Sequence, residues 1–166
     1  MGFKKVDVKT LDMKPFEKIG SEWMLISAAK DGKANTMTAS WGGIGVLWGK
    51  NVATVYIRPQ RHTKEFVDAG DTFTISFFGG GHMKELGYLG KVSGKDVPDK
   101  IEQSGLHLTE VDGQRDSKRP HRCWYAESFT MMTSNRKTSM NRKKMKDGIR
   151  KKIIIPCTSL RSGSAG

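Results

Sequence analysis

Apolar residues in the first two thirds of the chain form short runs separated by turn residues. The run from Trp23 to Ala29 ends before Asp31-Gly32, which predicts a buried strand, a tight turn and a return strand from Thr36 to Trp41. From Val52 to Arg58, β-branched and aromatic residues fill both alternating sets of positions, as in a strand covered on both faces. These patterns are typical of a sheet built from short strands.

The segment from Thr72 to Phe78 alternates apolar with hydroxyl side chains, which predicts a strand with one polar face. Short helices are expected between the strands, one capped by Thr63 and another from Val97 to Ser104 capped by Asp96. Strands at short spacing with small helices favour a mainly β fold. We expect an antiparallel barrel or sandwich rather than alternating parallel βαβ units.

The pattern changes after Gly113, where valine disappears and Ile153 to Ile155 is the only consecutive aliphatic run. The 166 residues carry 29 Lys and Arg against 17 Asp and Glu, a formal +12. Residues 1–113 are nearly neutral, whereas residues 114–166 hold 14 basic and 3 acidic side chains. We therefore expect one domain over residues 1–113, and a basic tail over 114–166 that contributes little core.

Two cysteines, Cys123 and Cys157, lie in the tail without a CxxC pair or a histidine at zinc-finger spacing. This pattern predicts no metal centre and no disulfide framework, and it fits a reducing compartment. No apolar core follows Lys4 and Lys5, and no 18 apolar residues are consecutive, so neither a signal peptide nor a membrane span is expected. The expected location is the cytoplasm, without membrane association.

An anion-binding pattern occurs where the strand ending at Arg58 meets the expected helix at Thr63. Arg58, Arg61 and Thr63 place two guanidinium groups and a hydroxyl around a turn stiffened by Pro59. Guanidinium forks and free N–H groups at a helix start suit phosphate oxygens. The alternative is that both arginines are solvated surface charges.

A second candidate segment is a strand of short polar and small residues that opens into glycines. Its residues are Asn35, Thr36, Met37, Thr38, Ala39, Ser40 and Trp41. Accessible backbone groups and one indole could hold a flat heteroaromatic ligand by its edge and by its face. The alternative is that Trp41 is a core aromatic and the glycines are ordinary turns.

Together these segments resemble a known family. The runs NTMTASWGGIGVLWGK, VATVYIRPQRHTKEF, TFTISFF and GYLGKVSGKDV are similar to flavin reductase-like proteins of the FMN-binding split-barrel superfamily, particularly the flavoredoxin branch. The resemblance covers residues 3–113. It implies a split β-barrel with Greek-key connections and a homodimer that holds FMN near the subunit interface.

The resemblance also assigns roles to residues. It implies that Asn35 to Trp41 line the isoalloxazine, and that Arg58, Arg61 and Thr63 lie at the phosphate side. The loop from Ser93 to Asp96 would close over the flavin, with Ser93 and Lys95 as contacts. Leu89 stands where many relatives carry Cys, and no function is attached to it.

The tail lacks the family's C-terminal strands and its acidic, proline- and tyrosine-rich segment. A frame displaced by one base converts Met131-Met132 and Met132-Thr133 to Asp, and Met140-Asn141 to Glu, whatever the codons. With permitted wobble bases, Arg122 to Asn141 becomes VLVCRKLYHDDFKPENFHE, which resembles the missing family tail. We infer that residues from about Gln114 onward are an out-of-frame product, which leaves the barrel without its last strands.

The sequence thus predicts an FMN-dependent oxidoreductase, with NAD(P)H or a redox protein as electron donor and free flavin or a protein as acceptor. No catalytic side chain is expected, because the four histidines (His62, His82, His107 and His121) are scattered and the cofactor carries the chemistry. Two alternatives remain open. One is a nucleic-acid-binding module that acts through the basic tail, and the other is an inactive truncated relative.

Overall fold

The computed structural model describes residues 3–47, 49–70, 72–110, 122–124, 129–134 and 152–162. Its strands are β1 (Phe3–Val6), β2 (Met24–Lys30), β3 (Lys33–Ala39), β4 (Gly42–Leu47), β5 (Lys50–Tyr56), β6 (Thr72–Phe77), β7 (Leu108–Glu110), β8 (Arg122–Trp124), β9 (Phe129–Ser134) and β10 (Lys152–Ser162). The α-helices are α1 (Thr63–Ala69), α2 (Met83–Lys91) and α3 (Lys100–Gln103), preceded by a 3-10 turn (Val8–Thr10) and a π-helical segment (Phe16–Ser21).

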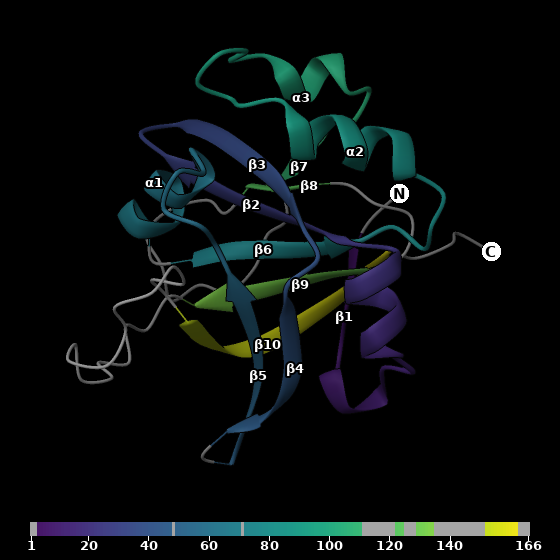
Figure 1. Cartoon of the computed structure of the whole chain (residues 1–166). Coiled ribbons are helices and arrows are strands. Elements are labelled where there is room, and N and C mark those ends of the chain that lie inside the picture. The colour runs from purple at the N-terminus through teal and green to yellow at the C-terminus, as the bar shows by residue number, and fades with distance from the viewer. Residues whose placement is uncertain are drawn as a thin grey trace.

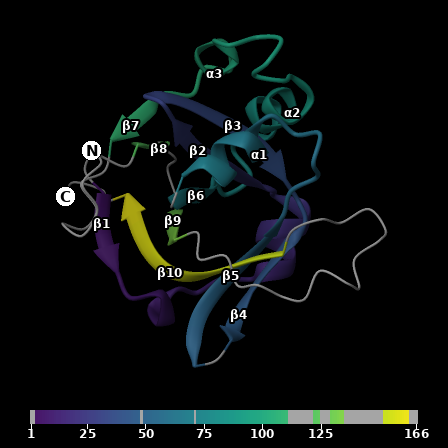
Figure 2. The same cartoon turned by 90° about the vertical axis from the view of Figure 1, so that its left-hand side faces the viewer.

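Eight of these strands form one curled antiparallel sheet. The hydrogen-bonded order is β3-β2-β6-β9-β10-β5-β4, with β1 paired to β10, while β7 and β8 form a separate pair. The sheet wraps round a core, and α2 and α3 lie together beside β3 (Figures 1 and 2). The predicted mainly β, antiparallel barrel is therefore confirmed.

The barrel is not short of C-terminal strands, which corrects the expectation drawn from the basic tail. β9 pairs with β6, and Lys152 to Pro156 of β10 pair with β5. From Cys157 onward β10 pairs with β9 and then also with β1, so it joins the two parts of the sheet. Ladder bonds use only the backbone, and the threonines of β9 and the isoleucines of β10 have high strand propensity.

The predicted turn at Asp31-Gly32 is confirmed as a two-residue hairpin loop between β2 and β3. Asp31 has φ +50° and Gly32 has φ +74°, the positive values that the tightest hairpin turns require. The hairpin register pairs Leu25 with Thr38 and Met24 with Ala39. This register fixes where the polar strand β3 begins and ends.

Two apolar clusters lie on opposite faces of the β3-β2-β6 region. Met24, Ile26, Phe73, Ile75 and Phe77 belong to the interior cluster. On the other face, Leu25 packs with helix residues such as Leu86, Leu89 and Ile101. The helices therefore cover the outer face of the sheet.

Two sequence-based expectations are inaccurate. The supposedly polar face of the Thr72–Phe77 strand is buried, with Thr74 at 4% and Ser76 at 0% exposure. The helix expected over Val97–Ser104 spans only Lys100–Gln103, and α2 was not predicted.

In the part of the chain that the structure describes, no helix is long and apolar enough to cross a bilayer.

Candidate functional site

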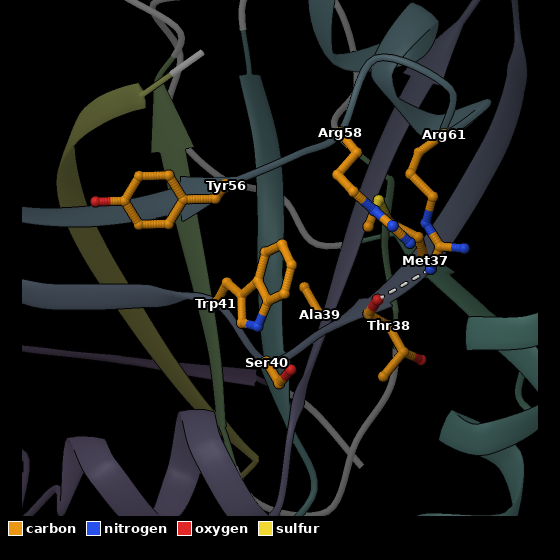
Figure 3. A pocket seen from close by; sticks show the side chains of 8 residues that line it. All are labelled: Met37, Thr38, Ala39, Ser40, Trp41, Tyr56, Arg58 and Arg61. Atoms are coloured by element: carbon orange, nitrogen blue, oxygen red, sulfur yellow. Dashed lines mark hydrogen bonds between the residues drawn. The ribbon is translucent and has the colours of Figure 1, made fainter. Parts of the chain in front are cut away.

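A pocket opens between the C-terminal half of β3, the end of β5 and the turn that follows β5. The lining residues are Met37, Thr38, Ala39, Ser40, Trp41, Tyr56, Arg58 and Arg61. Seven of these eight come from the two segments that the sequence singled out. Figure 3 shows the two arginines on one side of the pocket, and Trp41 and Tyr56 on the other.

The guanidinium groups of Arg58 and Arg61 lie side by side next to Met37 and Thr38 (Figure 3). Arg61 donates from one Nη to the carbonyl of Gly90 at 2.8 Å and from the other to the carbonyl of Thr38 at 3.3 Å. Burial and the neighbouring Arg58 lower the pKa of Arg61. None of the ion pairs among the described residues involves either arginine. This end of the pocket therefore carries two guanidinium groups that no carboxylate of the described residues neutralises.

Backbone groups of β3 are available at the same place, because among the described strands β3 is the terminal one of the sheet and pairs only with β2. Its outer edge carries N–H and C=O groups without a strand partner. The carbonyl of Thr38 uses this edge to accept the bond from Arg61. The hydroxyl of Thr38 donates instead to the Leu86 carbonyl of α2, at 2.6 Å. The edge of β3 can thus bind the polar edge of a flat ligand while the Thr38 side chain stays bound to α2.

Trp41 and Tyr56 form the aromatic side of the pocket. Trp41 is 55% exposed, and its carbonyl accepts a bond from the Tyr56 amide at 3.3 Å. The close approach of the strands depends on Gly42, since a Cβ there would lie 2.5 Å from the Thr54 carbonyl oxygen. The close packing of β4 on β5 therefore explains why a glycine directly follows Trp41 in the sequence.

Three of the other predicted residues are buried outside the pocket wall. The Thr36 hydroxyl lies 2.9 Å from both the Ser27 hydroxyl and the Ile26 carbonyl, within the sheet. Asn35 donates to the Thr63 hydroxyl at 3.2 Å, so it joins β3 to the start of α1. Thr63 is 2% exposed. These contacts support the strand and the turn that carry the lining residues.

Ser93 and Lys95 also lie outside the pocket lining. They form a turn in which the Lys95 amide donates to the Ser93 hydroxyl at 3.1 Å. The intervening Gly94 packs directly against the Asn35 side chain, leaving no room for a Cβ. The turn is therefore close to the β3–α1 junction, while its two polar side chains remain outside the wall.

The sequence did not single out Tyr56 or Lys100. Tyr56 lies in the predicted strand, but the pattern could not tell which of its two covered faces would border a pocket. Lys100 is 2% exposed and donates to the carbonyl of Val92 at 2.8 Å. Burial, together with the nearby Arg61, lowers the pKa of Lys100 to about 8. No local signal marks a buried lysine in the segment Pro98 to Gln103.

The described histidines do not form a catalytic set with the pocket. His62 and His82 each lie near a glutamate three residues later in the chain, Glu65 and Glu85. Neither histidine lines the pocket. Over the described ranges, no three His, Cys, Asp or Glu side chains gather as metal ligands.

Solved structures provide the comparison. The FMN-binding domain of a flavin reductase-like enzyme from Shewanella baltica OS155 has a TM-score of 0.69 at 17% identity, covering 96% of this chain and 77% of that one. Flavoredoxin of Desulfovibrio vulgaris (Miyazaki F) has a TM-score of 0.64 at 18% identity, with the same coverage. This chain shares the fold of those proteins.

A third similar structure is an NADH:FAD oxidoreductase of Streptomyces globisporus. Its TM-score is 0.63 at 14% identity, over 89% of this chain and 79% of that one. No family model and no curated protein sequence matches this chain. The likeness is thus one of fold, and the residues of the pocket must carry the functional argument.

Proposed function

We propose that this chain is a flavoprotein of the flavin reductase-like, flavoredoxin type that binds FMN in the pocket beside β3. The observation that carries this proposal is the convergence of two guanidinium groups, a free strand edge and two aromatic side chains in one pocket. FMN has the matching parts, since it joins a phosphate to a flat heteroaromatic ring. The fold that the chain shares with FMN-binding flavin reductase-like and flavoredoxin structures supports the same assignment.

Arg58 and Arg61 would bind the phosphate. Arg61 uses two of its five N–H groups on the carbonyls of Gly90 and Thr38, which leaves three for a ligand. Arg58 is exposed and can turn toward the same anion. A phosphate between them would offset both the burial of Arg61 and its repulsion from Arg58, the two causes of its lowered pKa.

The edge of β3 and the residues after it, from Met37 to Trp41, would hold the ring system. Backbone N–H and C=O groups there alternate, as do the acceptors and donors along the edge of a flavin. Trp41 would offer an apolar surface to the ring. In this arrangement the chain binds and orients the cofactor, and Thr38 is kept in place by Leu86.

Bound FMN would supply hydride and electron transfer, which the side chains of the pocket do not provide. We propose a nicotinamide or a redox protein as the electron donor. A homodimer is proposed from the resemblance alone. In such a dimer a second copy would enlarge the pocket, which in this chain measures about 160 Å³ against the roughly 300 Å³ or more of usual ligand sites.

Titration of the full chain with FMN tests the proposal. We expect saturable quenching of flavin fluorescence and a shifted visible absorption band. Oxidation of NADH or NADPH in the presence of FMN would then identify the donor, and sedimentation would give the oligomeric state. A chain that is folded by circular dichroism but leaves flavin fluorescence unchanged would contradict the proposal.

Binding of nucleic acid through the basic tail is a weaker candidate. Residues 129–134 and 152–162 are strands of the main sheet, so these parts of the tail already complete the barrel. Salt-dependent retention on DNA or RNA, lost when residues 114–166 are removed, would favour that candidate.

A further inference from the structure

Lys100, the first residue of α3, buries its ammonium group against the end of α2. Its Nζ donates to the carbonyl of Val92 at 2.8 Å and, over a longer 3.4 Å, to the carbonyl of Leu89. A lysine is seldom fully buried unless it has partners. None of the ion pairs in the described ranges includes Lys100, so these partners are backbone carbonyls.

The same end of α2 also binds Arg61, one of the two residues proposed to hold the phosphate. Arg61 donates to the carbonyl of Gly90 at 2.8 Å. In the sequence this carbonyl lies between those of Leu89 and Val92, which accept from Lys100. The last carbonyls of a helix have no partner within the helix, and cations are favourable at this negative end of its dipole. Lys100 and Arg61 therefore divide these acceptors between them.

The two cations also affect each other. Arg61, in the turn before α1, is the charged side chain whose repulsion lowers the pKa of Lys100. The groups that face Lys100 from α2 and the residue after it are the carbonyls of Leu89 and Val92. Arg58 acts in turn on Arg61. Three positive groups thus follow one another from α3 to the pocket, and an anion in the pocket would stabilise all of them.

We propose that Lys100 is a positioning residue for the phosphate end of the pocket. By occupying the carbonyls of Leu89 and Val92, it fixes the Gly90 carbonyl that holds the Arg61 guanidinium beside Thr38. Without Lys100 two carbonyls would lose their donor, and Arg61 is the neighbouring cation that could turn toward them. The guanidinium would then leave the pocket. This inference rests on the proposed FMN binding.

The test compares FMN with riboflavin, which lacks only the phosphate. Dissociation constants are measured by fluorescence for the full chain and for its Lys100→Met, Lys100→Arg and Lys91→Met variants. Lys91 is an exposed lysine at the same end of α2 and is the matched control. We expect Lys100→Met to weaken FMN about tenfold, as for a lost charge-assisted contact, with riboflavin changed less than about twofold. Lys100→Arg should largely restore FMN binding, and Lys91→Met should behave as the unmodified chain.

Equal weakening of FMN and riboflavin would overturn the proposal, because it would show a merely structural role. An unchanged FMN affinity would overturn it as well. An unmodified chain that binds neither flavin would instead contradict the proposed function itself.

If Lys100→Met does not fold, the pH dependence of flavin binding by the unmodified chain and by Lys100→Arg decides. The FMN-to-riboflavin affinity ratio of the unmodified chain should fall between pH 7 and pH 9 as Lys100 loses its proton, and that of Lys100→Arg should stay constant. A ratio with the same pH dependence in both proteins would overturn the proposal.

Discussion

Arg58 and Arg61 lie in the same pocket but differ in what their side chains already bind. Arg61 is held by two backbone carbonyls, whereas Arg58 is exposed and has no side-chain hydrogen bond among the described residues. Substitution of Arg58 should therefore remove ligand contacts while leaving the fold intact. Substitution of Arg61 should remove both ligand and fold contacts.

We expect Arg58→Ala to weaken FMN binding about tenfold and to leave the thermal midpoint unchanged, because a charge-assisted bond to phosphate is lost. Arg61→Ala should weaken FMN and also lower the midpoint. Fluorescence titration and thermal unfolding measure the two effects. Lys30→Ala, which removes an exposed charge at the far end of the β2–β3 hairpin, is the control. Loss of riboflavin binding in Arg58→Ala would argue against a phosphate contact.

Lys100 gives a stability prediction whose sign follows from its lowered pKa of about 8. Between that value and the ordinary 10.5, the unfolded chain binds more protons at this group than the folded chain. The contribution of Lys100 to the free energy of unfolding should therefore increase as the pH rises through this window. Urea unfolding at pH 7.5 and pH 9.5 should show the unmodified chain gaining stability relative to Lys100→Met. A constant difference would contradict the lowered pKa of this buried lysine.

The pocket residues that could be predicted from sequence all lie in local patterns. Arg58 and Arg61 follow a strand within a few residues, and Thr38 to Trp41 lie along one segment that ends in glycines. Tyr56 and Lys100 depend on contacts between distant segments, because α2 and α3 must pack before Lys100 can be buried. Such packing leaves no mark in local periodicity.

At the scale of the elements, β4 and β5 hold the aromatic side of the pocket together. At Gly42 the backbone of β5 is too close for any side chain, whereas nothing lies within 4 Å of the position that a Cβ would take at the adjacent Gly43. The pair offers a matched experiment on the same strand. One substitution forces the strands apart and the other does not.

We expect Gly42→Ala to lower the free energy of unfolding by about 1–3 kcal/mol, the usual cost of inserting a group into a filled space. FMN should bind more weakly, since a backbone hydrogen bond joins Trp41 to Tyr56 next to Gly42. Gly43→Ala should leave both properties close to those of the unmodified chain. Chemical unfolding and FMN titration measure the effects, and equal behaviour of the two variants would contradict the role of Gly42.

The elements themselves were only partly predictable. The β2–β3 hairpin followed from its apolar run and its Asp31-Gly32 turn, and both are local signals. α2 was missed because its glycines at 87 and 90 weaken any helical pattern, while its burial depends on the outer face of the sheet. The hydroxyls of β6 were expected in solvent for the same reason, since no local sequence pattern indicates that helices cover that face of the sheet.

At the scale of the whole molecule, the barrel depends on strands from the basic tail. β9 and β10 connect β6 to β5, so among the described strands the sheet is continuous only through residues beyond 113. A chain that ends at Gly113 should expose the edge of β6 and the interior side chains Phe73, Ile75 and Phe77. We expect this shorter chain to bind a hydrophobic dye strongly, to aggregate and to bind no FMN. A monomeric, cooperatively unfolding product would contradict the dependence on β9 and β10.

The reading frame of the tail gives a separate prediction. We propose that restoring one base near the Gln114 codon regenerates a C-terminus that contains the forced Asp-Asp and Glu residues and carries a lower positive charge. Sequencing the gene tests the first part directly. The in-frame protein should also unfold at a higher temperature and bind FMN more tightly than this chain. Stop codons throughout the alternative frame would contradict the displaced frame.

The central claim is that a flavin lies along β3 with its phosphate at the two arginines. A crystal structure of the full chain grown with FMN is the most direct measurement. It should show the phosphate in contact with the guanidinium groups of Arg58 and Arg61, and the ring system along the backbone from Met37 to Trp41. FMN bound elsewhere, or in this pocket with its phosphate away from both arginines, would contradict the account.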